Sequence, residues 1–281
     1  MDGGRNRQPS FARRLRGRGL SVRYFRGYVS ISDERDVPVL LHIRNARAIS
    51  FRQLCELLLL DGVEKLGRVV NWRVRRLERH GLIQRFEQER FRGQPVFAIT
   101  PLGLRVLESR GHYLLSLPST TERIIHPTQI PHAMELVSIR LALANHGILR
   151  SWLGELEITS RNLVLEGGTA KDYDAVAEIA VEHELQTFAI EYERTAKASV
   201  RYQEIREMLG RDQTVDVVLY LTSDRNVLYL LALEMHGVAK RIGLALSESF
   251  RRDLLDANTL LAAGSSEVIP FRALFAPSLP D

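Results

Sequence analysis

The sequence contains a single cysteine, Cys55, and this scarcity excludes disulfide-stabilised proteins and proteins built on cysteine-ligated zinc. One cysteine cannot build a disulfide framework, and no set of cysteines and histidines has zinc-ligand spacing. Cys55 lies among leucines, where a buried thiol is typical. Long apolar runs are also missing, so no segment reaches the roughly 18 apolar residues of a membrane span. The first residues lack the apolar segment of a signal peptide. We therefore expect a cytoplasmic protein with no membrane partner.

Acidic residues are scarce at the start of the chain, which distributes the charge unevenly. Residues 1–28 hold eight Arg and one Asp, a net +7, and residues 29–117 carry a net +5. Residues 118–281 hold 16 Lys+Arg and 23 Asp+Glu, a net −7. Cations that neutralise phosphates release condensed counterions, so the basic part is the expected nucleic-acid side. Residues 1–28 are expected to be a disordered basic arm, either DNA-binding or merely solubilising.

The length of 281 residues leaves room for two domains, each with its own core. A stretch with three prolines and several Ser and Thr, SLPSTTERIIHPTQIP, has the composition of a linker. We predict an α/β protein with an N-terminal DNA-binding domain over 29–117, a linker over 118–131 and an α/β domain over 132–281.

The stretch from Glu64 to Thr100 predicts a helix followed by a β-hairpin. Four residues at helical spacing form an apolar stripe: Leu66, Val70, Val74 and Leu77. Basic residues occupy the opposite side, and only Arg73 lies near the edge of the stripe. Gly81 supplies a C-terminal stop. Strand-like runs follow over 82–86 and 95–100, joined by a charged loop.

A basic helix followed by a basic hairpin is typical of a winged helix-turn-helix, whose helix enters the major groove. The alternative is a solvated cationic face on an ordinary helix. A helix over 51–60 capped by Ser50, and a first helix over 33–46 with Ser32 as a possible N-cap, favour the winged helix. A further helix is expected over 102–110. The residues predicted to contact double-stranded DNA, without any cofactor, are Arg68, Asn71, Trp72, Arg75, Arg76, Arg79, Arg85, Arg90 and Arg92.

The C-terminal part predicts the order αβββαβ with further αβ elements. Helices are expected over 132–146, 195–209 and 225–236, and strands over 155–159, 173–181, 186–193, 215–221 and 242–246. Residues 215–221 are apolar on both faces apart from Asp216, as in a central strand covered by helices.

Three carboxylates and a lysine are candidate catalytic residues of this domain. Glu191 and Glu193 point to one face of a strand, Asp174 lies on the preceding strand, and Lys197 starts the next helix. The carboxylates are candidate ligands of Mg²⁺, and the lysine could position a nucleophile for phosphodiester hydrolysis. Spacing alone favours a polar surface patch in which Glu193 and Lys197 form a local ion pair. Four lone histidines are expected to be structural: His126, His132, His146 and His183.

Three segments resemble the replication-relaxation protein family: HAMELVSIRLAL (132–143), YDAVAEI (173–179) and FAIEYERTAKASVRYQEI (188–205). The likeness extends over roughly residues 33–240. It implies plasmid or mobile-element replication and transfer, and a winged helix followed by a degenerate restriction-endonuclease-like domain. In that core the first acid falls on Asp174 and the second on Glu191. The usual lysine position holds Glu193, which argues against catalysis, although Lys197 could substitute from the helix.

Together these features predict a sequence-directed DNA-binding protein of plasmid or mobile-element replication or mobilisation. Its nuclease-like domain would serve assembly, through homodimerisation or contact with replication or relaxase proteins, rather than catalysis. One alternative is a Mg²⁺-dependent DNA endonuclease targeted by the winged helix. The other is a structural accessory of a replication or relaxase complex.

Overall fold

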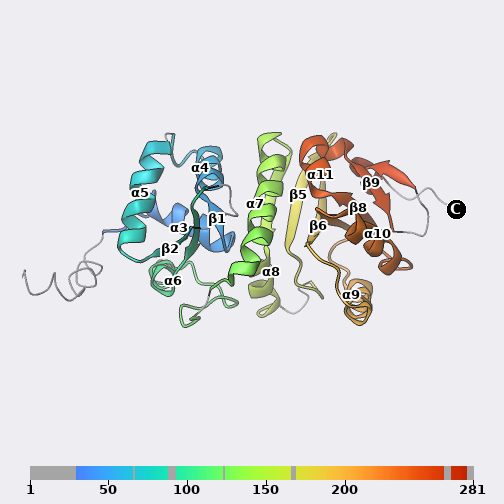
Figure 1. Ribbon diagram of the computed structural model, residues 1–281, viewed down its shortest axis with the longest axis horizontal. Helices are drawn as coiled ribbons and strands as arrows, with labels where there is room; N and C mark the ends of the chain where they lie inside the picture. The colour runs from blue at the N-terminus through green and yellow to red at the C-terminus, as the bar shows by residue number, and fades with distance from the viewer. Residues whose placement is uncertain are drawn as a thin grey trace, which may run out of the picture.

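The computed structural model describes residues 30–65, 67–87, 93–122, 124–165, 169–262 and 267–276. The chain is a mixed α/β protein with two sheets, one of three strands and one of seven (Figure 1). The small sheet and its helices form an N-terminal unit, and the large sheet with its helices forms a C-terminal unit. Helix α7 (Ile130–Asn145) lies between the two units.

The N-terminal unit combines four helices with the short sheet, whose strand order is β1-β3-β2. Its elements are α3 (Asp36–Asn45), β1 (Ile49–Ser50), α4 (Phe51–Leu60), α5 (Gly67–Arg79), β2 (Ile83–Phe86), β3 (Val96–Ile99) and α6 (Pro101–Glu108). The predicted order of helices and hairpin is confirmed, and the two-residue strand β1 was not predicted.

Caps were predicted for the starts of α3 and α4, and one of the two predictions is correct. Ser50 Oγ accepts the Gln53 backbone N–H at 3.3 Å, and Gln53 Oε1 accepts the Ser50 N–H at 3.1 Å. This reciprocal cap starts α4 at Phe51, as predicted. The predicted cap by Ser32 is wrong, because Ser32 donates its backbone N–H to the carboxylate of Asp36 at 2.8 Å. Helix α3 therefore begins three residues later than expected.

Helix α5 buries the predicted apolar stripe. Val70, Val74 and Leu77 are buried in the core of the N-terminal unit, whereas Leu66 lies outside the described residues. Gly81 has a φ of +71°, a conformation that glycine adopts without steric cost, and it ends the helix as predicted. The chain then enters β2, which pairs antiparallel with β3.

The predicted linker packs tightly where the two units meet. Ile124 and Ile125 are buried within it, and a short 3-10 helix, η2 (Pro127–Gln129), leads into α7. Helix α7 then buries residues in two cores. Val137 belongs to the core of the N-terminal unit, and Ile139 to the core on one face of the large sheet. Because α7 is apolar on both of these sides, it joins the two units through a continuous packed interface.

The C-terminal unit is built on the seven-stranded sheet, in the order β10-β9-β8-β7-β6-β5-β4. After α7 come β4 (Leu149–Gly154), α8 (Glu155–Asn162), β5 (Ala175–Val181), β6 (Glu184–Glu193), α9 (Ser199–Arg211), β7 (Val217–Thr222), α10 (Arg225–Glu234), β8 (Arg241–Leu246), α11 (Ser247–Asp253), η3 (Leu254–Asp256), β9 (Asn258–Leu261), β10 (Val268–Pro270) and η4 (Phe271–Phe275). Strand β7 is the central strand, as predicted, and runs parallel to β6 and β8.

The strand predicted over 155–159 is wrong, because these residues begin helix α8. Gly154 donates its N–H to the Glu157 side chain at 3.2 Å, and Glu155 and Glu157 place negative charge in the first turn. The strand is the preceding segment, β4, which pairs antiparallel with β5. The elements beyond β8 were not predicted.

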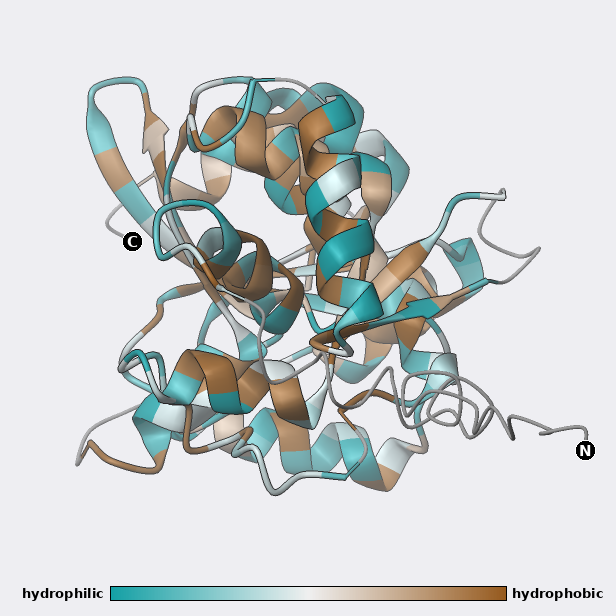
Figure 2. Ribbon diagram, turned by 90° about the vertical axis from the view of Figure 1, so that its left-hand side faces the viewer, coloured by the Kyte–Doolittle hydropathy of each residue, from teal (hydrophilic) through white to brown (hydrophobic). Residues whose placement is uncertain are grey.

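Helices cover both faces of the large sheet. Residues of α7, α11 and η4 pack on one face with Phe188 and Leu219, and residues of α9 and α10 pack on the other with Tyr220. Figure 2 views the molecule from the end occupied by α5 and shows hydrophobic and hydrophilic residues alternating along the helices. Within the described part of the chain, no helix has the length and apolarity to cross a membrane.

Candidate functional site

The outer side of α5 is an exposed surface with three arginines. Arg68, Arg75 and Arg79 are exposed, together with Asn71 and Trp72, and the Trp72 side chain keeps 61% of its surface accessible. An exposed tryptophan among arginines is unusual on a helix whose other side is packed in a core. We call these five residues the α5 surface. All five belong to the predicted DNA-contacting set.

Two further arginines of α5 are used for folding. Arg73 is buried, with its Nη1 2.8 Å from Asp36 Oδ1 and its Nη2 2.6 Å from Glu64 Oε1. Arg76, which was predicted to contact DNA, pairs with the other oxygen of Asp36 and lies 5.2 Å from the Trp72 ring centroid. Burial alone would raise the pKa of Asp36, but its hydrogen bonds to Arg76, Ser32 and Arg73 hold that pKa below its ordinary value. Arg76 therefore positions Trp72 while anchoring α5 to α3.

The hairpin contributes one described basic residue of the predicted set. Arg85 lies on β2, is exposed, and forms an ion pair with Glu87 at 2.9 Å. Arg90 and Arg92 lie outside the described residues.

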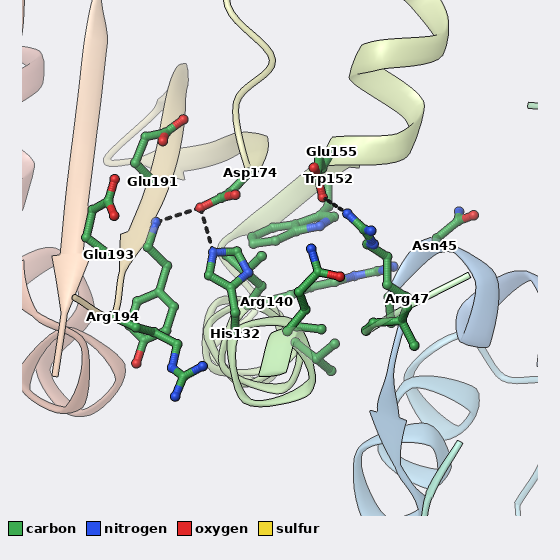
Figure 3. Close-up of a pocket in the computed structure, with 18 of the residues that line it drawn as sticks. Asn45, Arg47, His132, Arg140, Trp152, Glu155, Asp174, Glu191, Glu193 and Arg194 are labelled. Carbon is green, nitrogen blue, oxygen red and sulfur yellow. Dashed lines mark hydrogen bonds and ion pairs between the residues drawn. The ribbon is translucent and has the colours of Figure 1, made fainter. Parts of the chain in front are cut away.

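A cavity of about 330 Å³ lies between the two units (Figure 3). Its walls come from the α3–β1 connection, from α7, and from the ends of β4 and β6. All four predicted catalytic residues line it: Asp174, Glu191, Glu193 and Lys197. The sequence-based expectation that antiparallel strands bring these acids together is consistent with the pairing of β5 and β6.

Asp174 precedes β5 by one residue and lies at the centre of the cavity wall. Its Oδ2 accepts the backbone N–H of Tyr192 at 2.8 Å and lies 3.1 Å from His132 Nε2. Burial acts to raise the pKa of Asp174, but the bonds and charge of His132, the Tyr192 N–H and the charge of Lys171 together lower it. For His132 the opposite balance holds, because burial lowers its pKa and the contacts with Asp174 and the charge of Glu155 raise it above the ordinary value. His132, which was expected to be structural, therefore has a carboxylate partner that lies 42 residues away in the sequence.

Glu191 has a buried lysine partner that the sequence did not suggest. Both side chains are almost inaccessible, and Lys171 Nζ bonds to Glu191 Oε1. The same ammonium lies 4.9 Å from the ring centroid of Tyr173. Burial raises the pKa of Glu191 to about 7, although the charge of Lys171 acts in the opposite direction.

Glu193 pairs with Lys197, the local ion pair that spacing alone favoured. Each acid of the cluster thus has its own basic partner: His132 for Asp174, Lys171 for Glu191 and Lys197 for Glu193. Among the described residues, no three Asp, Glu, His or Cys side chains are grouped so that they could hold one metal ion. The acids share a cavity, and each is engaged separately by its own partner.

The cavity has a second side, where Arg47 and Trp152 lie beside a further acid, Glu155. Figure 3 shows Arg47 and Trp152 on the far side of Asp174 from Glu191 and Glu193. Arg47 Nη1 bonds to Glu155 Oε2 at 2.7 Å and so joins the two units. Arg140 of α7 also lines the cavity, and burial lowers its pKa despite the charges of Asp61 and Glu157.

Sequence reasoning missed three polar residues of this site: Arg47, His132 as a partner of Asp174, and Lys171. His132 is 42 residues from Asp174, and Lys171 is 20 residues from Glu191. A usable signal existed for Lys171, because it lies three residues before Asp174 in the run KDYDA. No local signal marks Arg47.

Comparison with known proteins gives one family. The family described as Replication-relaxation matches residues 40–218, well over half of the chain. The matched range includes α5, α7 and the whole acidic cluster. No curated protein and no solved structure matches the chain.

Proposed function

The chain belongs to the replication-relaxation family, and from that membership we propose that it is a sequence-directed double-stranded DNA-binding protein of plasmid or mobile-element replication or mobilisation. In this proposal the N-terminal unit is a winged helix, with α5 in the major groove and the β2–β3 hairpin on the DNA backbone. The C-terminal unit is a nuclease-like domain used for assembly.

The α5 surface is the observation that carries the proposal. Arg68, Arg75 and Arg79 are exposed while their neighbours Arg73 and Arg76 are held by Asp36. Arg68, Arg75 and Arg79 form no ion pair with the residues that the structure describes, so their donors are available for guanine edges and phosphates. Solvation alone does not account for an exposed indole on this face, whereas the Trp72 ring can contact bases or sugars.

Selection of a preferred duplex from a random pool, followed by fluorescence anisotropy, tests this function. The triple variant Arg68→Ala, Arg75→Ala and Arg79→Ala should lose most affinity and most of the salt dependence, because three phosphate or base contacts are removed. Arg105→Ala, an exposed arginine of α6, is the matched control and should bind as the parent does. Equal binding by the parent and the triple variant would reject the assignment of α5.

A metal-dependent DNA endonuclease is the second candidate, favoured by one observation. Asp174, Glu191 and Lys197 line a single cavity, as the catalytic groups of a nuclease would. The separate ion pairs of these acids argue against it. Incubation of the parent protein with supercoiled or single-stranded DNA and Mg²⁺ or Mn²⁺ tests for cleavage. The variants Glu191→Gln and Lys197→Gln are assayed in parallel. Cleavage by the parent that both substitutions abolish would establish the nuclease.

A third role needs no catalysis and no sequence preference. The C-terminal unit could hold replication or relaxase proteins, or a second copy of the chain, through its acidic surface. Sedimentation of the purified chain, with and without duplex DNA, separates a homodimer from a monomer that requires a different partner.

A further inference from the structure

The cavity between the units combines arginine side chains that lack ion-pair partners with a partly buried indole. Four of its acids have basic partners: Glu155 has Arg47, Asp174 has His132, Glu191 has Lys171 and Glu193 has Lys197. Two arginines that line the cavity, Arg140 and Arg194, form no ion pair within the described part of the chain, although the charges of Asp61 and Glu157 act on Arg140. Their guanidinium groups can therefore engage an anionic group of a ligand.

The arginines also have hydrogen-bond donors to spare. Within the described part of the chain, Arg140 forms no hydrogen bond or ion pair, and the buried Nε of Arg47 has no acceptor. Buried donors without acceptors are costly, so a ligand that supplies oxygen atoms would be stabilised there. Arg194 lies exposed on the cavity wall and donates to the carbonyl of Thr128 at 2.8 Å, which leaves its remaining N–H groups available.

Trp152 supplies the other half of a nucleotide site. Its partly buried indole lines the same cavity, next to the wall that carries Asp174 (Figure 3). Aromatic rings provide stacking surfaces for bases in sites that bind single strands. The volume of about 330 Å³ lies at the lower end of the range for small-ligand sites, about 300–1,000 Å³, and so limits the ligand to about one nucleotide.

We propose that this cavity binds one nucleotide unit of DNA, with the base against Trp152 and the phosphate held by Arg140. The site is separate from the α5 surface and does not depend on it. The nucleotide can come from a single strand, as a phosphodiester, or from a free nucleotide, as a phosphomonoester, and both present a base and phosphate oxygens.

The two tryptophans of the chain make a specific test possible. In the full-length Trp72→Phe variant, the only tryptophan is Trp152, whose fluorescence reports on the cavity alone. Titration with a short oligothymidylate should change its emission. A parallel titration with thymidine monophosphate shows whether the bound nucleotide belongs to a strand or is free. A response to the oligonucleotide alone indicates a strand, and a response to the monophosphate alone indicates a free nucleotide. No response to either would overturn the proposal.

Substitutions in the same Trp72→Phe background identify the phosphate contact. Arg140→Gln should weaken binding by about tenfold or more, because the substitution removes the charged hydrogen-bond donors assigned to the phosphate. Arg150→Gln is the matched control, since Arg150 is exposed on β4, two residues from Trp152, and does not line the cavity. Equal weakening by both variants, or by neither, would overturn the proposal. If circular dichroism shows that Arg140→Gln does not fold, Arg194→Gln replaces it in the test. Arg194 is exposed, so this residue can be changed without disturbing the core. Unchanged binding by Arg194→Gln would overturn the proposal.

Adding Arg75→Ala to the Trp72→Phe background separates this site from the α5 surface. It should respond to oligothymidylate as the Trp72→Phe protein does, while duplex affinity falls. Loss of the Trp152 response on this change alone would place the ligand on α5 and overturn the cavity assignment.

Discussion

His132 Nε2 lies 3.1 Å from Asp174 Oδ2, and this pair fastens helix α7 to the start of β5. The same Asp174 oxygen accepts the backbone N–H of Tyr192, whose ring centroid lies 5.5 Å from that of His132. Because α7 also packs against the N-terminal unit, the pair lies at the junction of the two units. A protonated imidazole is stabilised at this position, since the carboxylate beside it is buried and charged.

The raised pKa of His132 predicts how stability depends on pH. The folded protein binds this proton more tightly than the unfolded chain, whose imidazole has a pKa of about 6.5. The resulting stabilisation is complete below that value and is lost as the pH rises through the higher pKa of the folded state. Urea unfolding at a series of pH values from about 5.5 to 9, taken at intervals of about half a unit, should show this decline.

Substitution of the imidazole isolates the effect. His132→Gln should lower the free energy of unfolding by about 1–3 kcal/mol at pH 6, because a buried carboxylate loses a charged hydrogen-bond partner. The difference from the parent should shrink at pH 9. His146→Gln, at the exposed end of the same helix, is the matched histidine control. A constant difference across the pH range would show that His132 acts only by packing.

Local capping and periodicity made the N-terminal unit predictable. Ser50 and Gln53 are three residues apart, and the stripe of Val70, Val74 and Leu77 repeats within one helix. Such signals depend on neighbours in sequence, so the bounds of α4 and the end of α5 agree closely with the prediction. Gly154, in contrast, ends a strand and starts a helix at one residue, and the apolar pattern of 155–159 was read as a strand.

The candidate site was predictable only in part, because its partners are brought together by the tertiary fold. Asp174 and Glu191 were found from their places beside successive strands, and Lys197 from its spacing to Glu193. His132 reaches Asp174 only because α7 packs on one face of the sheet. Lys171 reaches Glu191 through the pairing of β5 with β6. No periodic pattern in the sequence encodes either contact.

Two neighbouring arginines of α5 should respond in opposite ways to substitution. Arg73→Ala removes a partner from buried Asp36 and from Glu64, and should cost about 3–5 kcal/mol of unfolding free energy. Arg75→Ala changes an exposed side chain and should alter stability by no more than about 0.5 kcal/mol. Urea unfolding of both variants measures the difference. Similar losses in both would mean that Arg75 is packed rather than exposed.

Arg75→Ala, which should hardly change stability, should clearly change the affinity for DNA. If Arg75 reads a base, Arg75→Ala should weaken binding to the preferred duplex by about 1–3 kcal/mol and reduce discrimination between sequences. Anisotropy titrations with the preferred duplex and a scrambled duplex measure both quantities. Arg105→Ala on α6 serves as the control. Equal weakening for both duplexes would assign Arg75 to a phosphate instead of a base.

The buried pair of Lys171 and Glu191 gives a second pH-dependent prediction, with a different window. The folded pKa of Glu191, about 7, lies above its ordinary value of 4.5, so its ionisation destabilises the fold as the pH rises between those values. Lys171→Met removes the cation that favours the carboxylate and raises that pKa further. The variant should therefore lose about 3–5 kcal/mol at pH 8, and clearly less at pH 5, where Glu191 is protonated in the parent as well. Urea unfolding at the two pH values measures the loss.

Lys197→Met, which removes the more exposed partner of Glu193, should cost no more than about 1 kcal/mol at either pH. A Lys171→Met loss that is equal at pH 5 and pH 8 would show that Glu191 does not titrate in this range and that its partner acts through packing alone.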